Sequence, residues 1–133
     1  MKPIKKEWLN RAKDDLCVIE EIIDNKNLTN MSAFHAQQAA KKILKAIIEE
    51  YEIDFVKTHE LEFLLEKVRK YITFDVDKTQ IKRLDEVYTE TRYPGDLGLL
   101  PYGKPAIEDI KKFQEFAKTL YKNAESLMKN HFK

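Results

Sequence analysis

A chain of 133 residues, of which 43% are hydrophobic and 35% charged, can bury the core of one domain without disulfides, so we expect a single domain over residues 1–133. The formal net charge is only +1, whereas most nucleic-acid binders have an excess of basic residues that bind phosphates. The chain has one cysteine, Cys17, which cannot form an internal disulfide. No run approaches the roughly 18 apolar residues of a membrane span, and no apolar signal segment follows the N-terminus, so we expect a cytoplasmic protein with no membrane partner.

The first half of the chain is predicted to form two long helices. Apolar residues at three- and four-residue steps predict a helix from Lys5 to about Asp24, and the break at residues 25–27 ends it. A second helix extends to about Tyr51. Small side chains in its alanine-rich first half would let a neighbouring helix approach closely, within the subunit or across a dimer contact. Three residues can cap the start of this helix with a side-chain oxygen: Thr29, Asn30 and Ser32.

The second half is expected to form three more helices. Thr58 can cap a third helix, whose first turn is acidic and so suits the positive end of the helix dipole. A fourth helix, with apolar residues from Ile81 to Tyr88, must end near Tyr93, because the residue before a proline avoids helical geometry. A fifth runs from Pro105 to the C-terminus, since proline suits the first turn of a helix.

A long loop separates the fourth and fifth helices. All three glycines and three of the four prolines lie between Pro94 and Pro105, and these residue types end helices. Loops of this length in a compact domain are usually functional or disordered, and the aromatic and aliphatic residues here favour a functional loop that packs on the helices. No segment has the two-residue period of a strand. The predicted fold class is therefore all-α, an up-and-down antiparallel four-helix bundle with one additional short helix, the third or the fourth.

One side of the second helix carries a row of polar residues. With the alanines of this helix facing the core, His35, Gln38 and Lys42 fall three and four residues apart and so line one face. An imidazole, an amide and an ammonium together can bind a phosphate or a base edge, or support acid–base chemistry through the histidine. The alternative is a hydrogen-bonded structural histidine beside a solvated lysine.

Three further candidate residues lie elsewhere in the sequence. His59 stands at the start of the third helix beside a lysine, where the helix N-terminus suits an anion; alternatively, it only packs near the cap. Arg92 is followed by a turn that begins at Tyr93, and its planar guanidinium is suited to bidentate recognition of phosphate or carboxylate. Alternatively, Arg92 donates hydrogen bonds to the last carbonyls of its own helix. Three scattered histidines do not suggest a metal site, and we expect neither metal nor cofactor.

Several blocks of the sequence together resemble the HEPN domain family. They occur in order across nearly the whole chain, and their combination is specific to that family although no single block is. The blocks are Trp8, Ala12 and Asp15-Leu16; Phe34 to Lys42 with Lys45-Ala46; Lys57 to Leu61; and Arg92 to Gly95.

The resemblance implies an up-and-down helical bundle, commonly dimeric, from the cytoplasm of a prokaryote. Family members are often encoded beside a minimal nucleotidyltransferase and form toxin–antitoxin pairs with it, and the family name reflects a proposed nucleotide-binding role. Other members are ribonucleases that cut RNA without metal. They use an arginine and a histidine that lies a few residues after it in the sequence, and these residues are paired across the dimer. No histidine lies five to seven positions after any arginine of this chain, so the usual ribonuclease pair is absent.

Three functions remain open from the sequence. The first is a nucleotide-binding or partner-binding module, expected as a homodimer, that acts with a minimal nucleotidyltransferase in a toxin–antitoxin or defence system. The second is a metal-independent ribonuclease with a rearranged active site, in which Arg92 holds the phosphate of the RNA and His35 or His59 transfers protons. The third is a structural dimerisation module. The missing arginine–histidine pair favours a non-catalytic function, and the residues expected to bind its nucleotide or RNA ligand are His35, Gln38, Lys42, His59, Arg92 and Tyr93.

Overall fold

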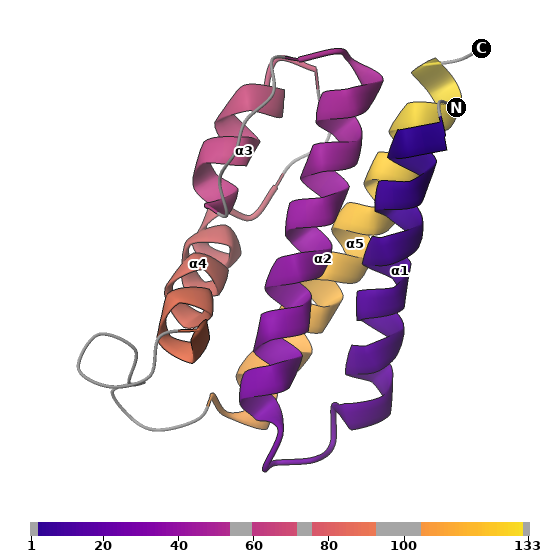
Figure 1. Cartoon of the computed structure of the whole chain (residues 1–133). Helices are drawn as coiled ribbons and strands as arrows, with labels where there is room; N and C mark the ends of the chain where they lie inside the picture. Colours follow the sequence, from indigo (N-terminus) through magenta and orange to yellow (C-terminus); the bar gives the residue numbers. More distant parts are fainter. Residues whose placement is uncertain (1–2, 54–59, 72–75, 93–104, 132–133) are drawn as a thin grey trace.

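The computed structural model describes residues 3–53, 60–71, 76–92 and 105–131, and helices occupy most of these ranges (Figure 1). The five helices are α1 (Pro3–Ile22), α2 (Thr29–Glu50), α3 (Leu61–Val68), α4 (Lys78–Arg92) and α5 (Ile107–His131). In Figure 1, α1 and α4 descend, α2 and α5 ascend, and the short α3 lies above α4. No strand occurs in the described ranges, and the predicted all-α fold is confirmed.

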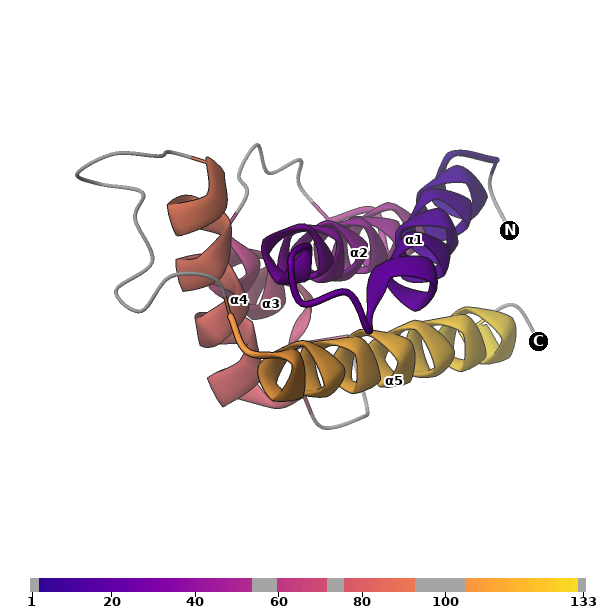
Figure 2. The same cartoon turned by 90° about the horizontal axis from the view of Figure 1, so that it is seen from below.

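Helix α2 is the centre of the domain and packs against each of the other four helices. In both views it lies between α1 on one side and α4 on the other (Figures 1 and 2). The buried side of the first half of α2 consists largely of alanines that are at most 1% exposed: Ala33, Ala36, Ala39 and Ala40. Only small side chains therefore separate this part of α2 from the neighbouring helices. Larger side chains complete the core, among them Ile43, Leu44 and Ile47 of α2, Leu61 and Leu64 of α3, and Phe113 of α5.

The start of α2 lacks a side-chain cap. Its N-cap is Leu28, which forms no side-chain cap hydrogen bond, and the helix begins at Thr29. A turn in which the Leu28 N–H donates to the Asn25 carbonyl sets this starting point. The prediction that Thr29, Asn30 or Ser32 caps the helix is wrong because these residues lie inside it. The Thr29 and Ser32 side chains are buried, and their hydroxyls bond no residue that the structure describes.

The start of α3 is capped by another helix. Its N-cap residue, Glu60, makes no side-chain cap bond. Instead, the Asp85 carboxylate of α4 accepts hydrogen bonds from the backbone N–H groups of Leu61 and Glu62, at N···O distances of 2.8 and 3.2 Å. One side chain thus satisfies two of the donors that every helix start leaves open. Thr58, the cap predicted from the sequence, lies outside the described residues.

Asp85→Ala is expected to lower the free energy of unfolding by about 1–2 kcal/mol, because it takes the acceptor from two backbone donors at the start of α3. Chemical denaturation followed by circular dichroism measures this loss. The matched control is Glu86→Ala, which removes an exposed neighbouring side chain and should change stability by less than about 0.5 kcal/mol. Equal losses in the two variants would contradict the capping role.

The same carboxylate makes stability depend on pH. Burial raises the pKa of Asp85 above its ordinary value; the two backbone hydrogen bonds oppose this rise, and the charges of Glu62 and Glu60 add to it. The charge of Asp85 therefore lowers stability above the folded-state pKa, and this loss is recovered as the pH falls through that pKa. Relative to Asp85→Asn, the wild type should gain stability between about pH 7 and about pH 4. A constant difference over that range would contradict the raised pKa.

Candidate functional site

The polar row on α2 lies beside α1, and one carboxylate joins the two helices there. Asp15 of α1 has a side chain that is only 9% exposed, and it contacts both ends of the row. Its Oδ1 atom lies 2.8 Å from His35 Nδ1, and its Oδ2 atom accepts a hydrogen bond from Lys42 Nζ at 2.7 Å. The structure thus connects two of the three predicted residues of the row through a residue from another helix.

Asp15 also changes the electrostatics of the row. The side chains of His35 and Lys42 are both 21% exposed, so the cluster lies at the edge of the core. Hydrogen bonds between an ammonium and a carboxylate are short and strong, and here the carboxylate neutralises the lysine. The cluster therefore has less positive charge for a phosphate than the sequence suggests, and its histidine is held in one orientation.

Gln38, the third member of the row, bonds inward. Its Nε2 atom donates to Gln37 Oε1 at 2.8 Å, and Gln37 is fully buried. This bond holds the Gln38 amide against the core, on the helix turn between His35 and Lys42. The row is therefore a set of side chains fixed largely by bonds within the subunit.

Apolar and aromatic side chains flank this cluster along both helices. One turn away, Met31 is 40% and Val18 is 38% exposed, and the Phe34 ring meets the ring of the histidine edge to face, with the centroids 5.3 Å apart. In the other direction, the Lys45 ammonium lies over the Trp8 ring, 5.6 Å from its centroid. We name this surface the α1–α2 face, and its members are Trp8, Asp15, Val18, Met31, Phe34, His35, Gln38, Lys42 and Lys45.

Three other predicted site residues lie away from this face or outside the described chain. His59 and Tyr93 are outside the described residues, as is the predicted loop up to residue 104. Arg92 ends α4, and only its backbone is described; α4 packs against α2 on the side away from α1 (Figure 2). For these three residues, participation in a shared ligand site stays a prediction.

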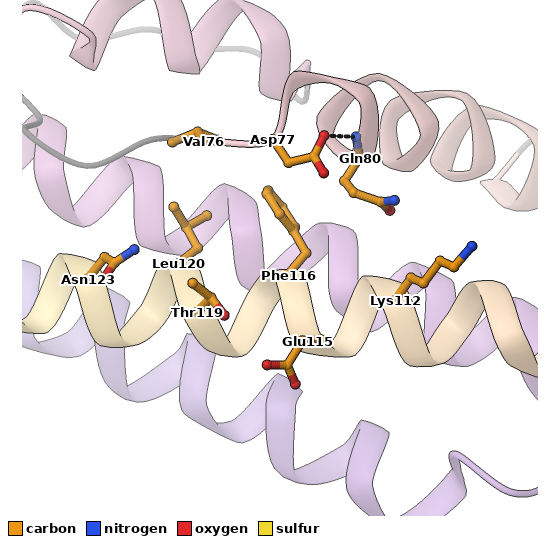
Figure 3. A pocket seen from close by; sticks show the side chains of 9 residues that line it. All are labelled: Val76, Asp77, Gln80, Lys112, Glu115, Phe116, Thr119, Leu120 and Asn123. Atoms are coloured by element: carbon orange, nitrogen blue, oxygen red, sulfur yellow. Dashed lines mark hydrogen bonds between the residues drawn. The ribbon is translucent and has the colours of Figure 1, made fainter.

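A separate pocket of about 450 Å³ lies between the start of α4 and α5 (Figure 3). Phe116 and Leu120 of α5 supply apolar surface, and polar side chains surround them. The Gln80 Oε1 atom is buried and bonds no residue that the structure describes. Asp77 is already engaged, since its Oδ1 accepts two backbone N–H groups at the start of α4. The lining residues are Val76, Asp77, Gln80, Lys112, Glu115, Phe116, Thr119, Leu120 and Asn123.

Sequence reasoning missed Asp15 as a site residue, although the sequence contains a signal for it. Asp15 lies three residues after Ala12 and four before Ile19, which are both fully buried, so it falls on the apolar stripe of α1. A carboxylate on such a stripe is rarely buried unless it is paired. Its partner His35 is 20 residues away, and helical spacing does not identify it. The α4–α5 pocket gave no such signal, because only the tertiary fold brings its two walls together.

Neither a metal centre nor a membrane helix is found in the described part of the chain. Within residues 3–53, 60–71, 76–92 and 105–131, no group of three or more His, Cys, Asp or Glu side chains could hold a metal ion. None of the helices seen there is long and apolar enough to cross a bilayer.

Comparison with known proteins identifies the family. No curated protein sequence matches the chain. The fold is similar to the crystal structure of an archaeal HEPN homologue, with a TM-score of 0.70 over 96% of this chain and 99% of that chain, at 19% sequence identity. The sequence also matches the HEPN domain over residues 5–130, which is nearly its whole length. With the helical fold in agreement, this chain belongs to the HEPN domain family.

Proposed function

We propose that this protein is a non-catalytic binding module whose α1–α2 face binds a protein partner, a minimal nucleotidyltransferase with which it forms a toxin–antitoxin or defence pair. The observation that carries the proposal is the Asp15 carboxylate, which joins His35 and Lys42 and cancels charge that a phosphate or RNA site would need. Membership of the HEPN family supports the nature of the partner, since members are often encoded beside such an enzyme.

The composition of the α1–α2 face supports a protein partner. Trp8 and Met31 belong to the residue types enriched at protein interfaces, where aromatic side chains supply much of the binding energy. Lys42 is paired with Asp15, and the Lys45 ammonium lies over an aromatic ring. A partner can therefore cover the centre of this face without burying an uncompensated charge, which is costly.

Titration of the purified protein with a minimal nucleotidyltransferase from the same genome tests the proposal. Val18→Glu and Met31→Glu each place a charge on the face and should weaken binding about tenfold or more. The control Phe63→Glu charges a side chain of α3 that is 47% exposed and should bind as the wild type does. An absence of binding by the wild type would contradict the proposed partner, and an equal loss in the control would contradict the proposed face.

A second copy of this chain could occupy the same face instead of the nucleotidyltransferase. This would be so if the protein is a homodimer through this face or a structural dimerisation module. Light scattering of the protein alone at micromolar concentration measures its mass. A dimer that Val18→Glu dissociates would assign the face to self-association. A dimer that survives both Val18→Glu and Met31→Glu would leave the face open to the nucleotidyltransferase.

The second candidate function is the metal-independent ribonuclease, and the Asp15–His35 pair favours it. A carboxylate on one ring nitrogen orients a histidine so that the other nitrogen can take up a proton. Incubation with mixed cellular RNA in EDTA distinguishes the functions, and the binding module should leave the RNA intact. Cleavage that His35→Ala or Arg92→Ala abolishes would support the ribonuclease instead.

A nucleotide is a further candidate ligand, at the α4–α5 pocket rather than at the polar row. Its volume of about 450 Å³ falls within the usual range of small-molecule sites. The buried Gln80 oxygen can accept a bond from a base edge, and the Phe116 ring offers apolar contact to a base. Calorimetric titration with ATP and AMP tests this site, and Gln80→Leu should abolish binding there while His35→Ala leaves it intact.

A further inference from the structure

We infer that His35 presents its Nε2 atom on the α1–α2 face as a hydrogen-bond acceptor, and that the partner meets it with an aromatic donor, a tryptophan N–H or a tyrosine hydroxyl. This inference rests on the proposed function, which identifies the α1–α2 face as a binding surface. Three features carry it: the bond between His35 and Asp15, the second bond of that carboxylate to Lys42, and the apolar neighbours of the histidine ring.

The contact with Asp15 selects the tautomer of His35. Asp15 Oδ2 accepts a hydrogen bond from the Lys42 ammonium at 2.7 Å. An ionised carboxylate only accepts hydrogen bonds, so the ring nitrogen that lies 2.8 Å from Oδ1, Nδ1, must carry a proton. In the neutral ring, the other nitrogen, Nε2, is then an acceptor.

The Nε2 atom is open to a partner. Among the described residues, none is found to bond it, and the His35 side chain is 21% exposed. A partner that covered Nε2 without offering a donor would bury an unpaired acceptor, which is unfavourable. The matching group on the partner is therefore an N–H or O–H donor.

The neighbours of the ring favour an aromatic donor. The Phe34 ring packs edge to face on the His35 ring, and the exposed Val18 and Met31 lie one turn away on their helices. Tryptophan and tyrosine combine a large apolar ring with one donor, and a methionine sulfur makes favourable contacts with aromatic rings. A phosphate is disfavoured in the same place because the Asp15 carboxylate lies on the other side of the imidazole.

Asp15 is a positioning residue in this arrangement, and Asp15→Asn should invert it. Lys42 offers only donors, so the asparagine oxygen turns toward Lys42 and its NH₂ group turns toward His35 Nδ1. Nδ1 then becomes the acceptor, and the ring proton moves to Nε2. The variant thus keeps the histidine but replaces the acceptor on the face by a donor.

Long-range ¹H–¹⁵N NMR correlations of the full chain at pH 8 show which ring nitrogen of His35 carries the proton. The wild type should have its proton on Nδ1, and Asp15→Asn should have it on Nε2. The matched control is Lys42→Met, which leaves Asp15 as an acceptor and should keep the proton on Nδ1. A proton on Nε2 in the wild type, or on both nitrogens, would overturn the inference, as would an unchanged tautomer in a folded Asp15→Asn.

Two small probes test the chemistry of the partner in the same NMR experiment. 3-Methylindole has the ring and the N–H of a tryptophan side chain, and 1,3-dimethylindole has the ring without the donor. In the wild type, 3-methylindole should shift the His35 and Phe34 signals and bind about fivefold more tightly than the dimethyl compound, the effect of one net hydrogen bond. Asp15→Asn should remove this preference. Equal binding of the two probes to the wild type, or the same shifts with inorganic phosphate, would overturn the inference.

These results separate the inference from the proposed function. If the nucleotidyltransferase binds the α1–α2 face while the two indoles bind equally, the aromatic donor is wrong and the binding module stands. If 3-methylindole is preferred and the nucleotidyltransferase does not bind, the acceptor at His35 stands and the proposed partner is wrong.

Discussion

Replacing Glu50 with alanine is expected to lower the free energy of unfolding by about 3–5 kcal/mol. Glu50 of α2 forms an ion pair with Lys5 of α1, and both side chains are 0% exposed. The substitution removes the carboxylate that compensates a buried ammonium, and an ammonium in an apolar interior is strongly unfavourable. Urea denaturation followed by circular dichroism measures the loss.

The double variant Lys5→Met, Glu50→Leu is the control for this effect. It replaces both charges by apolar groups of similar size, so it should be within about 1 kcal/mol of the wild type or more stable. A loss in the double variant as large as that in Glu50→Ala would show that packing volume, rather than the uncompensated charge, is responsible. A loss below about 1 kcal/mol in Glu50→Ala itself would contradict full burial of the pair.

Phe113→Ala should cost about 3–5 kcal/mol, because it removes a ring from the centre of the core. Phe113 of α5 is 1% exposed and belongs to the main hydrophobic cluster around α2. Truncation loses the transfer free energy of the ring and leaves a cavity that the surrounding helices fill only in part. The same denaturation measurement applies, and thermal unfolding should show a lower midpoint.

Phe63→Ala is the matched control, since it makes the same chemical change on the surface. Phe63 of α3 is 47% exposed, and the Lys67 ammonium lies over its ring, 5.7 Å from the centroid. An exposed cation–π contact contributes only about 0.5–1 kcal/mol, so the loss should not exceed about 1 kcal/mol. Comparable losses in the two variants would contradict the placement of α5 against the core.

The helices follow from the sequence because their signals are local. The apolar period predicted a first helix from Lys5 to about Asp24, and α1 spans Pro3–Ile22. The helix starts two residues earlier than predicted because a proline at the first position needs no N–H partner there. Proline also marked the start of α5, which begins at Ile107, two residues after Pro105.

The candidate site could be predicted only in part, because half of it depends on tertiary contacts. His35, Gln38 and Lys42 share one side of α2 as a direct consequence of helical spacing. The carboxylate that joins two of them comes from α1, and the cap of α3 comes from Asp85 of α4. Each of these bonds depends on how two helices are aligned along their axes, and no period within one helix encodes that alignment.

Two ion pairs fix how α1 is aligned along α2. Lys5 meets Glu50 where α1 begins and α2 ends, and Asp15 meets Lys42 further along the pair. A slip of one turn, about 5.4 Å, would break both ion pairs at once. A single residue inserted in α1 between positions 5 and 15 would rotate the two charges apart by about 100° around the helix. The length of this segment is therefore fixed by the two pairs, and homologues that keep both should tolerate no insertion or deletion there.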